Sequence, residues 1–191
     1  AEQPVVIADA LRRYVQAGAL HLPAEVDFKD VDRITMVACG TASYACHVAK
    51  YWFEQIAGLP ADIDVASEFR YREAPLSKNG LSIFISQSGE TADTLAALKY
   101  AKELGHRYSL SICNVATSAM VRETTLSYLT RAGVEIGVAS TKAFTTQLVA
   151  LFTLAATLAK HRGLLTATAE QEYLAALRQL AGSVQFALNL E

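Results

Sequence analysis

The stretch from Leu81 to Thr91, L-S-I-F-I-S-Q-S-G-E-T, runs from a mostly apolar segment into a cluster of hydroxyl side chains around one glycine. Residues Leu81 to Ile85 are rich in strand-forming types, as expected of a strand buried on both faces of a parallel sheet. From Ala92 to Leu104, leucines and alanines recur on one stripe, which predicts a helix. The stretch is therefore a strand–loop–helix connection.

The loop of this connection has the composition of an anion-binding site. Ser86, Ser88 and Thr91 come just before the helix, where the first backbone N–H groups have no partner within the helix. Hydroxyls and free N–H groups together can hold a phosphate. The same residue types also cap ordinary helices and form ordinary turns, so the loop alone leaves both interpretations open.

Two further turns have the same character. Residues 40–43, G-T-A-S, follow an expected strand at 33–39, and residues 139–142, A-S-T-K, follow a strand-like approach at 133–138. Each turn precedes an expected helix. In open α/β sheets, ligands bind beyond the carboxyl ends of the strands. All three turns would lie at that edge, which favours an anion site over three unrelated caps.

Strand-like and helix-like segments alternate along the chain. We expect strands at 33–39, 63–66, 81–85, 108–115 and 126–130, and helices at 5–17, 44–56, 92–104, 117–123, 143–161 and from Thr168 onward. Thr168 and Gln171 match a capping box for the last helix. Such alternation produces right-handed β-α-β units and therefore an α/β fold, in which helices cover a parallel sheet on both faces. The order of the strands is not readable from the sequence.

Composition limits the classes of protein that the chain can belong to. Its 191 residues are 52% hydrophobic and 19% charged, enough for one sizeable core. The net charge of −2 comes without a basic stripe, so we expect no nucleic-acid partner. The first residues lack the pattern of a secretory signal, and the longest apolar stretch, Leu148 to Ala159, is too short to span a bilayer. We therefore expect a cytoplasmic protein without membrane contact.

Cysteine and histidine residues give no sign of a metal or a cofactor. Cys39 and Cys113 lie in apolar strand-like runs, and with Cys46 they form no C-x-x-C pair. The four histidines share no metal-ligand spacing; His47, on a helix after a glycine turn, is interpreted as a surface or packing residue. Neither the P-loop pattern nor G-x-G-x-x-G after a strand occurs, so a nucleotide or dinucleotide site is disfavoured.

Two segments allow a structural and a functional interpretation. Arg70 and Arg72 could serve an anion or a subunit contact, but a solvated salt-bridging face explains them better. The helix around residues 144–159 is apolar nearly all the way round, as in a core helix or a subunit interface.

The predicted anion site offers neutral hydrogen-bonding groups. Glu90 and Asp93, in the first turn of the helix, favour the helix dipole but oppose a bound dianion. The phosphate should therefore be held mainly by directed hydrogen bonds. Gln87 in this loop, and Thr41 and Ser140 in the neighbouring turns, could bond to sugar hydroxyls. A small polyhydroxylated phosphate ester fits this chemistry.

Several motifs carry a family resemblance. They are C-G-T-A-S at 39–43, Y-W-F-E at 51–54, A-S-E-F-R-Y-R at 66–72, S-Q-S-G-E-T-A-D-T at 86–94, I-C-N-V at 112–115 and E-I-G-V-A-S-T-K-A-F-T-T-Q at 135–147. Together they closely resemble the glucosamine-6-phosphate synthases, the glutamine:fructose-6-phosphate amidotransferases. The chain resembles the first of two sugar-isomerase (SIS) subdomains in the isomerase half of these enzymes.

The resemblance implies a fold and a set of substrate contacts. The fold would be a three-layer α/β/α arrangement with a mainly parallel sheet of about five strands. Matching positions imply that Ser86, Gln87, Ser88 and Thr91 hold the phosphate of fructose 6-phosphate or glucosamine 6-phosphate. Four other residues would line the sugar: Thr41, Ala42, Val138 and Ser140. Where C-G-T-S is frequent in the family, this chain has Ala42, which could contribute only its backbone.

The resemblance also implies what lies outside this chain. In the family, the imine-forming lysine and the acid–base residues belong to the second SIS subdomain, and the ammonia-producing cysteine belongs to the glutaminase domain. We therefore expect no catalytic residue here, and we interpret Lys142 as structural or as an electrostatic aid. Residues 1–30 would follow the glutaminase domain, 31–165 would form the SIS domain, and 166–191 would lead to the second subdomain.

Three functions remain open at this point. The first is a substrate-binding part of an amidotransferase that forms a homodimer, without catalysis by the fragment alone. The second is a free-standing SIS module that senses a sugar phosphate and regulates a partner. The third is a stand-alone phosphosugar isomerase, which would need a base and an acid that the sequence does not place near these loops.

Overall fold

The computed structural model describes residues 2–21, 27–106, 108–137 and 140–190. Its main sheet has five strands in the order β4-β3-β5-β6-β7, and every neighbouring pair is parallel. The strands are β3 (Ile34–Ala38), β4 (Ala61–Val65), β5 (Leu81–Ser86), β6 (Tyr108–Cys113) and β7 (Leu126–Leu129). The α/β class and the parallel sheet expected from the sequence are confirmed.

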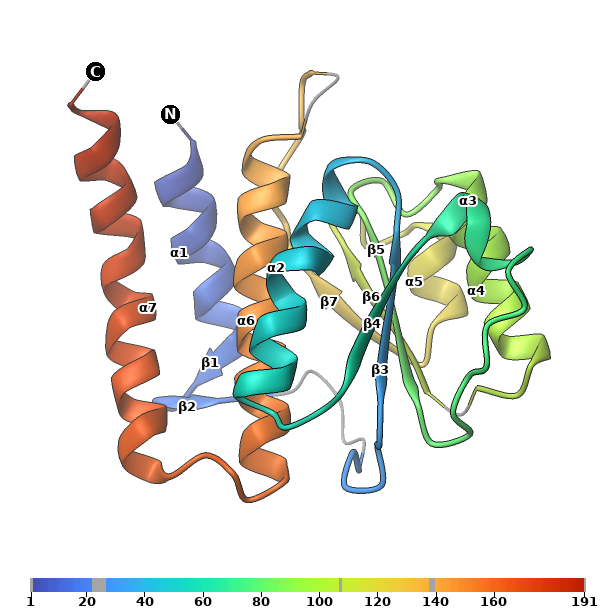
Figure 1. The fold of residues 1–191 in the computed structure, drawn as a ribbon. Helices are drawn as coiled ribbons and strands as arrows, with labels where there is room; N and C mark the ends of the chain where they lie inside the picture. The colour runs from blue at the N-terminus through green and yellow to red at the C-terminus, as the bar shows by residue number, and fades with distance from the viewer. Residues whose placement is uncertain (1, 22–26, 107, 138–139, 191) are drawn as a thin grey trace.

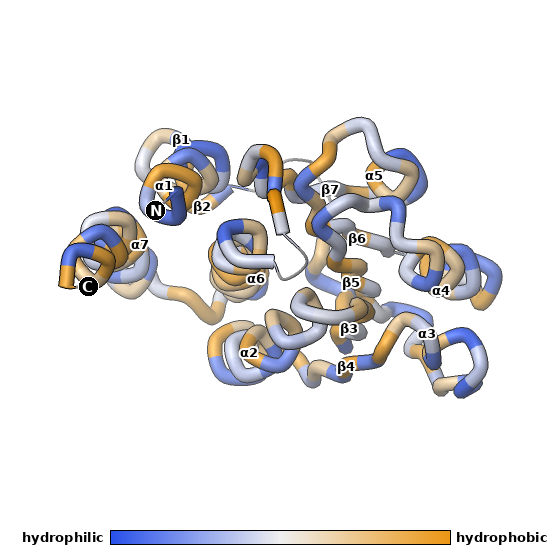
Figure 2. The backbone as a smooth tube through the Cα atoms, turned by 90° about the horizontal axis from the view of Figure 1, so that it is seen from above, coloured by the Kyte–Doolittle hydropathy of each residue, from blue (hydrophilic) through white to orange (hydrophobic). Residues whose placement is uncertain are grey.

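Seven helices are present in the described residues, and most of them cover one of the two faces of the sheet (Figures 1 and 2). They are α1 (Gln3–Tyr14), α2 (Thr41–Gln55), α3 (Ala66–Phe69), α4 (Ala92–Glu103), α5 (Ala119–Glu123), α6 (Lys142–His161) and α7 (Ala167–Leu188). In Figure 2, α3, α4 and α5 lie on one side of the strands and α1, α2, α6 and α7 on the other. The three layers are therefore helix, sheet and helix.

Alternating residues of each strand feed two different hydrophobic clusters, because successive side chains of a strand point to opposite faces. Met36, Ile83 and Ile112 belong to the larger cluster with α1, α2, α6 and α7. Val37 and Phe84 belong to the smaller cluster with α3 and α4. Burial on both faces explains why Leu81–Ser86 reads as a nearly continuous apolar run.

The order of the strands places a topological switch point between β3 and β5. From β3 the chain crosses to β4 on one side, whereas β5, on the other side of β3, continues to β6 and β7. The helices that leave β3 and β5 therefore diverge to opposite faces. A crevice opens beyond the carboxyl ends of these two strands, where open α/β sheets bind ligands.

Helix α6 is a core helix of this chain. Of the described helices it alone is long and apolar enough to cross a membrane by length and composition, and 78% of the relevant window is buried inside the protein. Leu151, Leu154 and Leu158 are fully buried in the larger cluster. Packing within the chain thus explains the apolar pattern of this helix, for which the sequence allowed either a core helix or a subunit interface.

The terminal helices pack into the same core. Leu11 of α1 and Leu177 of α7 belong to the larger cluster, together with residues of the sheet. Helix α7 lies outermost, beside α1 (Figure 2). Figure 1 shows the start of α1 and the end of α7 at the same end of the molecule as the carboxyl ends of the strands.

Three local predictions were wrong. The first helix ends at Tyr14 rather than Ala17, because Ala17 and Gly18 adopt positive φ and turn the chain into a small hairpin, β1 (Val15–Gln16) and β2 (Ala19–Leu20). The last helix is capped by Thr166, whose hydroxyl accepts from the Ala169 N–H, and not by Thr168. No strand is assigned to residues 133–137 in the described part of the segment before Ser140.

Candidate functional site

A small cavity lies in the crevice at the switch point. Its volume is about 230 Å³, below the usual size of drug-binding pockets. All three predicted turns contribute to its lining, which consists of Cys39, Thr41, Ala42, Ile85, Ser86, Gln87, Ser88, Thr91, Thr94, Ser140 and Gln147. Seven of the eight residues predicted for the substrate are therefore brought together. The eighth, Val138, lies outside the described residues.

The loop after β5 is arranged by its own hydroxyls. Ser86 Oγ accepts a hydrogen bond from the Gly89 N–H at 3.0 Å and lies 3.0 Å from Thr91 Oγ1. Ser88 Oγ accepts from the Glu90 N–H at 3.2 Å. Because Ser86 already accepts from the backbone, its own proton is available for Thr91 or for a ligand. The loop thus presents preorganised donors to the cavity.

Gly89 allows this loop to lie against the next strand. It adopts a left-handed conformation, φ 69°, and its carbonyl accepts from the Met120 N–H at 3.1 Å. A Cβ atom placed here would lie 2.7 Å from Cys113 Sγ and would overlap Ser118. Both conformation and space therefore require glycine at this position.

The acidic residues beside the loop are engaged elsewhere. Glu90 Oε1 accepts from the Ala119 N–H at 2.7 Å and so caps α5. The Asp93 carboxylate lies 3.8 Å from Arg70. Neither carboxylate lines the cavity. The repulsion that the sequence suggested for a bound dianion is thereby reduced, and Arg70 is an ion-pair partner, as is Arg72 with Asp64 at 2.7 Å.

The turn after β3 contributes the start of α2. Gly40 adopts φ 57°, which places Thr41 and buried Ala42 at the cavity. Ser43 is turned away, since its hydroxyl donates to the Gly40 carbonyl at 2.7 Å. Cys39 follows the last residue of β3 and lines the cavity, whereas the sequence suggested a thiol within a strand.

The third turn is held by Glu135. Its carboxylate accepts from the Ala143 N–H at 2.8 Å and from the Thr141 hydroxyl at 3.0 Å, and Ser140 Oγ lies 3.4 Å from it. Burial raises the pKa of Glu135, but these hydrogen bonds and the nearby Lys142 outweigh it, so the pKa is lowered. A carboxylate in the loop therefore acts as the N-terminal cap of α6 and holds Ser140 at the cavity.

Other candidate residues have structural surroundings. Lys142 Nζ lies 2.5 Å from the Glu2 carboxylate and is mostly buried, which agrees with its interpretation as structural. Burial raises the pKa of Cys46 to about 12 and also raises the pKa of Cys113, so neither thiol is a ready nucleophile. His47 is exposed. Within the described ranges, no group of three or more metal-ligating side chains occurs.

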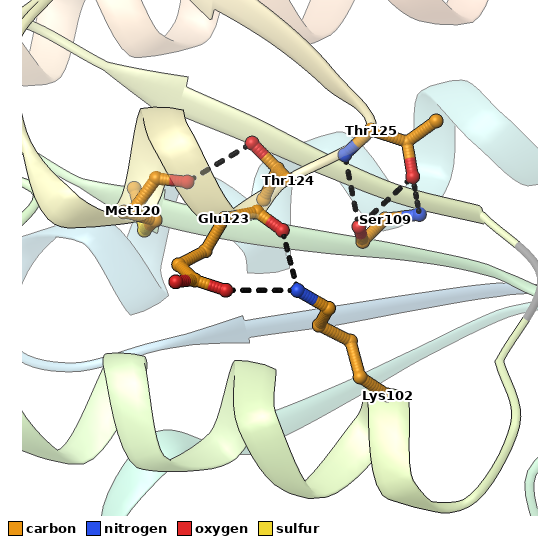
Figure 3. Close-up of polar contacts among 6 residues, drawn as sticks. All are labelled: Lys102, Ser109, Met120, Glu123, Thr124 and Thr125. Atoms are coloured by element: carbon orange, nitrogen blue, oxygen red, sulfur yellow. Dashed lines mark hydrogen bonds and ion pairs between the residues drawn. The ribbon is translucent and has the colours of Figure 1, made fainter.

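A hydroxyl-rich cluster elsewhere in the chain forms hydrogen bonds within itself and to nearby backbone groups. At the start of β6, Ser109 and Thr125 exchange hydrogen bonds, and Thr124 Oγ1 donates to the Met120 carbonyl at 3.0 Å (Figure 3). Lys102 bridges the Glu123 carboxylate and carbonyl in the same region. These hydroxyls tie a helix–strand connection together. A high content of serine and threonine is therefore no sufficient sign of a site.

The two largest of the other hollows have paired charges. One, of about 740 Å³, lies at the edge strand β4, where Arg33 pairs with Asp62 at 2.6 Å. The other, of about 820 Å³, lies between α1 and the loop before α6, where Lys142 pairs with Glu2. The first contains none of the three hydroxyl turns, and the second contains only Thr141 and Lys142 of the third turn. The small cavity is the better candidate because its polar groups converge on one space.

Sequence reasoning missed two polar residues of the cavity, Thr94 and Gln147. Thr94 lies in α4, three residues after Thr91, and Gln147 lies in the second turn of α6. Each is the last residue of a motif quoted above, at 86–94 or at 135–147, but the sequence pattern gave neither of them a role. Only the meeting of α4 and α6 at one crevice brings them to the site.

This parallel sheet, with a hydroxyl-lined crevice at its switch point, is the architecture of sugar-isomerase domains, and the SIS domain model matches residues 27–157. The chain belongs to the SIS domain family. Over its full length it is 56% identical to glutamine–fructose-6-phosphate aminotransferase (isomerizing) from Neisseria meningitidis serogroup B. It is also 54% identical, again over its full length, to the enzyme of that name from Xylella fastidiosa Temecula1. The resemblance stated from the sequence is confirmed.

Solved structures agree with this placement. The C-terminal domain of glucosamine-fructose-6-phosphate aminotransferase from Francisella tularensis matches with a TM-score of 0.96 and 42% identity, covering 99% of this chain and 54% of that one. Glucosamine-6-phosphate deaminase from Thermotoga maritima shares the fold, with a TM-score of 0.62 and 24% identity, over 84% of this chain and 49% of that one. The chain spans about a third of the length of the two aminotransferases, 32% of each.

Proposed function

We propose that this chain is the first SIS subdomain of a glutamine–fructose-6-phosphate aminotransferase and binds the phosphate of fructose 6-phosphate or glucosamine 6-phosphate. The observation that carries the proposal is the cavity at the switch point, in which Ser86, Ser88 and Thr91 converge while the nearby carboxylates are engaged elsewhere. A neutral cradle of hydroxyls and amides suits a phosphate ester held by directed hydrogen bonds.

Each predicted contact has a place in this proposal. Ser86, Gln87, Ser88 and Thr91 hold the phosphate at the loop after β5. Thr41 and Ser140 face the sugar from the neighbouring turns, with Ala42 contributing its backbone and Val138 its part of the third turn. The support is their common position around one cavity, Val138 excepted, and the hydroxyl chemistry that they share.

The whole reaction is proposed for a longer chain. That chain would convert fructose 6-phosphate and glutamine into glucosamine 6-phosphate and glutamate, with the ammonia-producing cysteine and the imine-forming lysine on segments other than this one. A glutaminase domain and a second SIS subdomain would be its covalent partners, and the protein would work as a cytoplasmic homodimer without a cofactor. The length and names of the aminotransferase relatives support this part.

Calorimetric titration with fructose 6-phosphate and glucosamine 6-phosphate tests the site. Ser86→Ala and Ser88→Ala should each weaken binding by about 1–3 kcal/mol, the cost of losing a hydrogen bond to a charged group. Ser183→Ala is the matched control, because this serine is exposed on α7 and bonds only to its own helix. Equal affinities of the wild type and the double variant would show that the phosphate is held elsewhere.

An isomerisation assay on the same chain tests the third alternative that the sequence left open, a stand-alone isomerase. No conversion of fructose 6-phosphate is expected, because the residues proposed for proton transfer lie on another segment. Measurable turnover would instead support a stand-alone isomerase and overturn the proposal of a binding subdomain.

A further inference from the structure

Two polar groups at the cavity lack hydrogen-bond partners. Gln147 is 2% exposed and Thr94 is 1% exposed. Gln147 Oε1 and Thr94 Oγ1 are buried, and neither bonds to any group in the part of the chain that the structure describes. Both residues line the cavity. Buried polar groups in proteins nearly always form hydrogen bonds, so two buried groups without a partner at one cavity require an explanation.

The two residues approach the cavity from opposite faces of the sheet. Thr94 belongs to α4, on the face that α3 and α5 also cover, and follows Thr91 by one helical turn. Gln147 belongs to α6, which packs against α2 on the other face. A ligand in the crevice would therefore have Thr94 on the side of the phosphate loop and Gln147 on the far side.

The chemistry of the two groups differs. A phosphate dianion offers only acceptors, so it can satisfy the Thr94 hydroxyl but not the carbonyl oxygen of Gln147. That carbonyl needs a donor, and a sugar hydroxyl is one. The terminal torsion of a glutamine is broad, so a small rotation turns the carbonyl toward a ligand at little cost.

We propose that Gln147 is a specificity-determining residue that accepts a hydrogen bond from a hydroxyl of the bound sugar, while Thr94 completes the phosphate cradle from α4. The inference rests on the proposed function of the cavity. It assigns the ligand an orientation, with its phosphate toward α4 and its sugar toward α6. Gln147 then distinguishes a sugar phosphate from a phosphate that carries no hydroxylated chain.

The test compares three probes, fructose 6-phosphate, ethyl phosphate and inorganic phosphate, by chemical-shift titration in NMR. Gln147→Met keeps the unbranched shape of the side chain and removes the amide. It should weaken the binding of fructose 6-phosphate about tenfold, as expected for one lost hydrogen bond. The affinities for the other two probes should change less than about twofold. Thr94→Val should weaken the binding of all three probes, whereas Thr94→Ser, which keeps the hydroxyl, should bind them as the wild type does.

Matched controls exclude an indirect effect. Gln55→Met and Thr168→Val make the same changes at exposed helical positions and should leave all affinities unchanged. Thermal unfolding of each variant checks folding, and Gln147→Leu, which also removes the amide, provides a second measurement of sugar selection if Gln147→Met does not fold.

The outcomes separate this inference from the proposed function. If the wild type bound none of the three probes, the phosphate site itself would be wrong. If the wild type bound them and Gln147→Met weakened all three equally, or none, then Gln147 would not select the sugar. A loss of affinity in Gln147→Met that is confined to fructose 6-phosphate supports the inference. A loss of affinity for all three probes in Thr94→Val that is absent in Thr94→Ser supports it as well.

Discussion

At the level of single residues, Gly89 links the conformation of the loop after β5 to the strand behind it, β6. Its left-handed backbone lies between the N–H groups of Gly89 and Glu90, which donate to the Ser86 and Ser88 hydroxyls. Its missing side chain lets the loop pack on Cys113 and Ser118. The shape of the loop therefore depends on a residue that offers no chemistry of its own.

We predict that Gly89→Ala destabilises the chain by roughly 2–5 kcal/mol, because the left-handed strain of alanine adds to overpacking against β6. Gly105→Ala is the matched control: its φ is 78°, but a Cβ atom there meets nothing within 4 Å. It should cost only about 1–2 kcal/mol. Urea unfolding measures both, and equal losses would show that the close packing behind Gly89 is unimportant.

Residue-level prediction from sequence selected loop residues that line one cavity, and it missed the two helical residues of that cavity. The serines and threonines after β5 could be predicted because hydroxyls between a strand and a helix are a local pattern. The roles of Glu90 and Ser43 could not, since each is decided by a partner that the sequence does not place. Gln147 and Thr94 end two of the quoted motifs, but their position at the cavity could not be predicted for the same reason.

At the level of elements, α7 is tied to two others by one carboxylate. Glu170 Oε1 accepts from the Leu20 N–H and from Lys160 Nζ, both at 2.8 Å, and so joins α7 to β2 and α6. Burial raises the pKa of Glu170, but the hydrogen bonds from Lys160 and Leu20 outweigh it, and the pKa is lowered. The ionised form therefore stabilises the fold.

A pH dependence follows from this lowered pKa. The stabilisation should be complete above the unfolded pKa of a glutamate, about 4.3, and should be lost as the pH falls through the lower folded value. Glu170→Gln should thus cost about 1 kcal/mol at pH 7, and the cost should fall toward zero as the pH drops through the lowered pKa of Glu170 in the folded chain. Urea unfolding of wild type and variant across this pH range measures the difference in the free energy of unfolding, and Glu172→Gln, at an exposed position, is the control. A cost that stays constant with pH would contradict the role of the charge.

Element-level prediction succeeded where the pattern was periodic. The strand at Leu81 and the long helix at α6 were placed nearly correctly, because burial imposes a regular apolar spacing. The segment before Ser140 was not, because Glu135 and backbone groups of α6 hold it without a strand. The small hairpin after α1 was also missed, since its strands have only two residues each.

At the level of the whole molecule, α7 is part of the core. Leu174 is fully buried and Leu177 nearly so. A row of aromatic rings links α2, α6 and α7. The ring centroids of Trp52 and Phe152 are 5.3 Å apart, and those of Phe152 and Tyr173 are 5.4 Å apart. The sequence suggested the α/β class and the layers, but neither the strand order nor this packing, because both depend on long-range contacts that leave no local trace.

Truncation tests the place of α7. A chain ending at residue 165 should lose roughly 3–6 kcal/mol, the contribution of burying two leucine side chains. A chain ending at Val184 should lose less than about 1 kcal/mol, because Phe186 and Leu190 beyond it are exposed. Fluorescence of Trp52 during urea unfolding follows both. Equal stability of the two chains would make α7 a separate linker.

Both ends of the described chain lie at the same end of the molecule as the carboxyl ends of the strands, as Figure 1 shows. Any domain joined by a short linker to either end is therefore tethered at the same end of the molecule as the crevice. Tethering of this kind raises the effective concentration of the attached domain to the millimolar range for short flexible linkers. Even a weak contact between such a domain and the crevice would then be occupied most of the time, without a large interface between them.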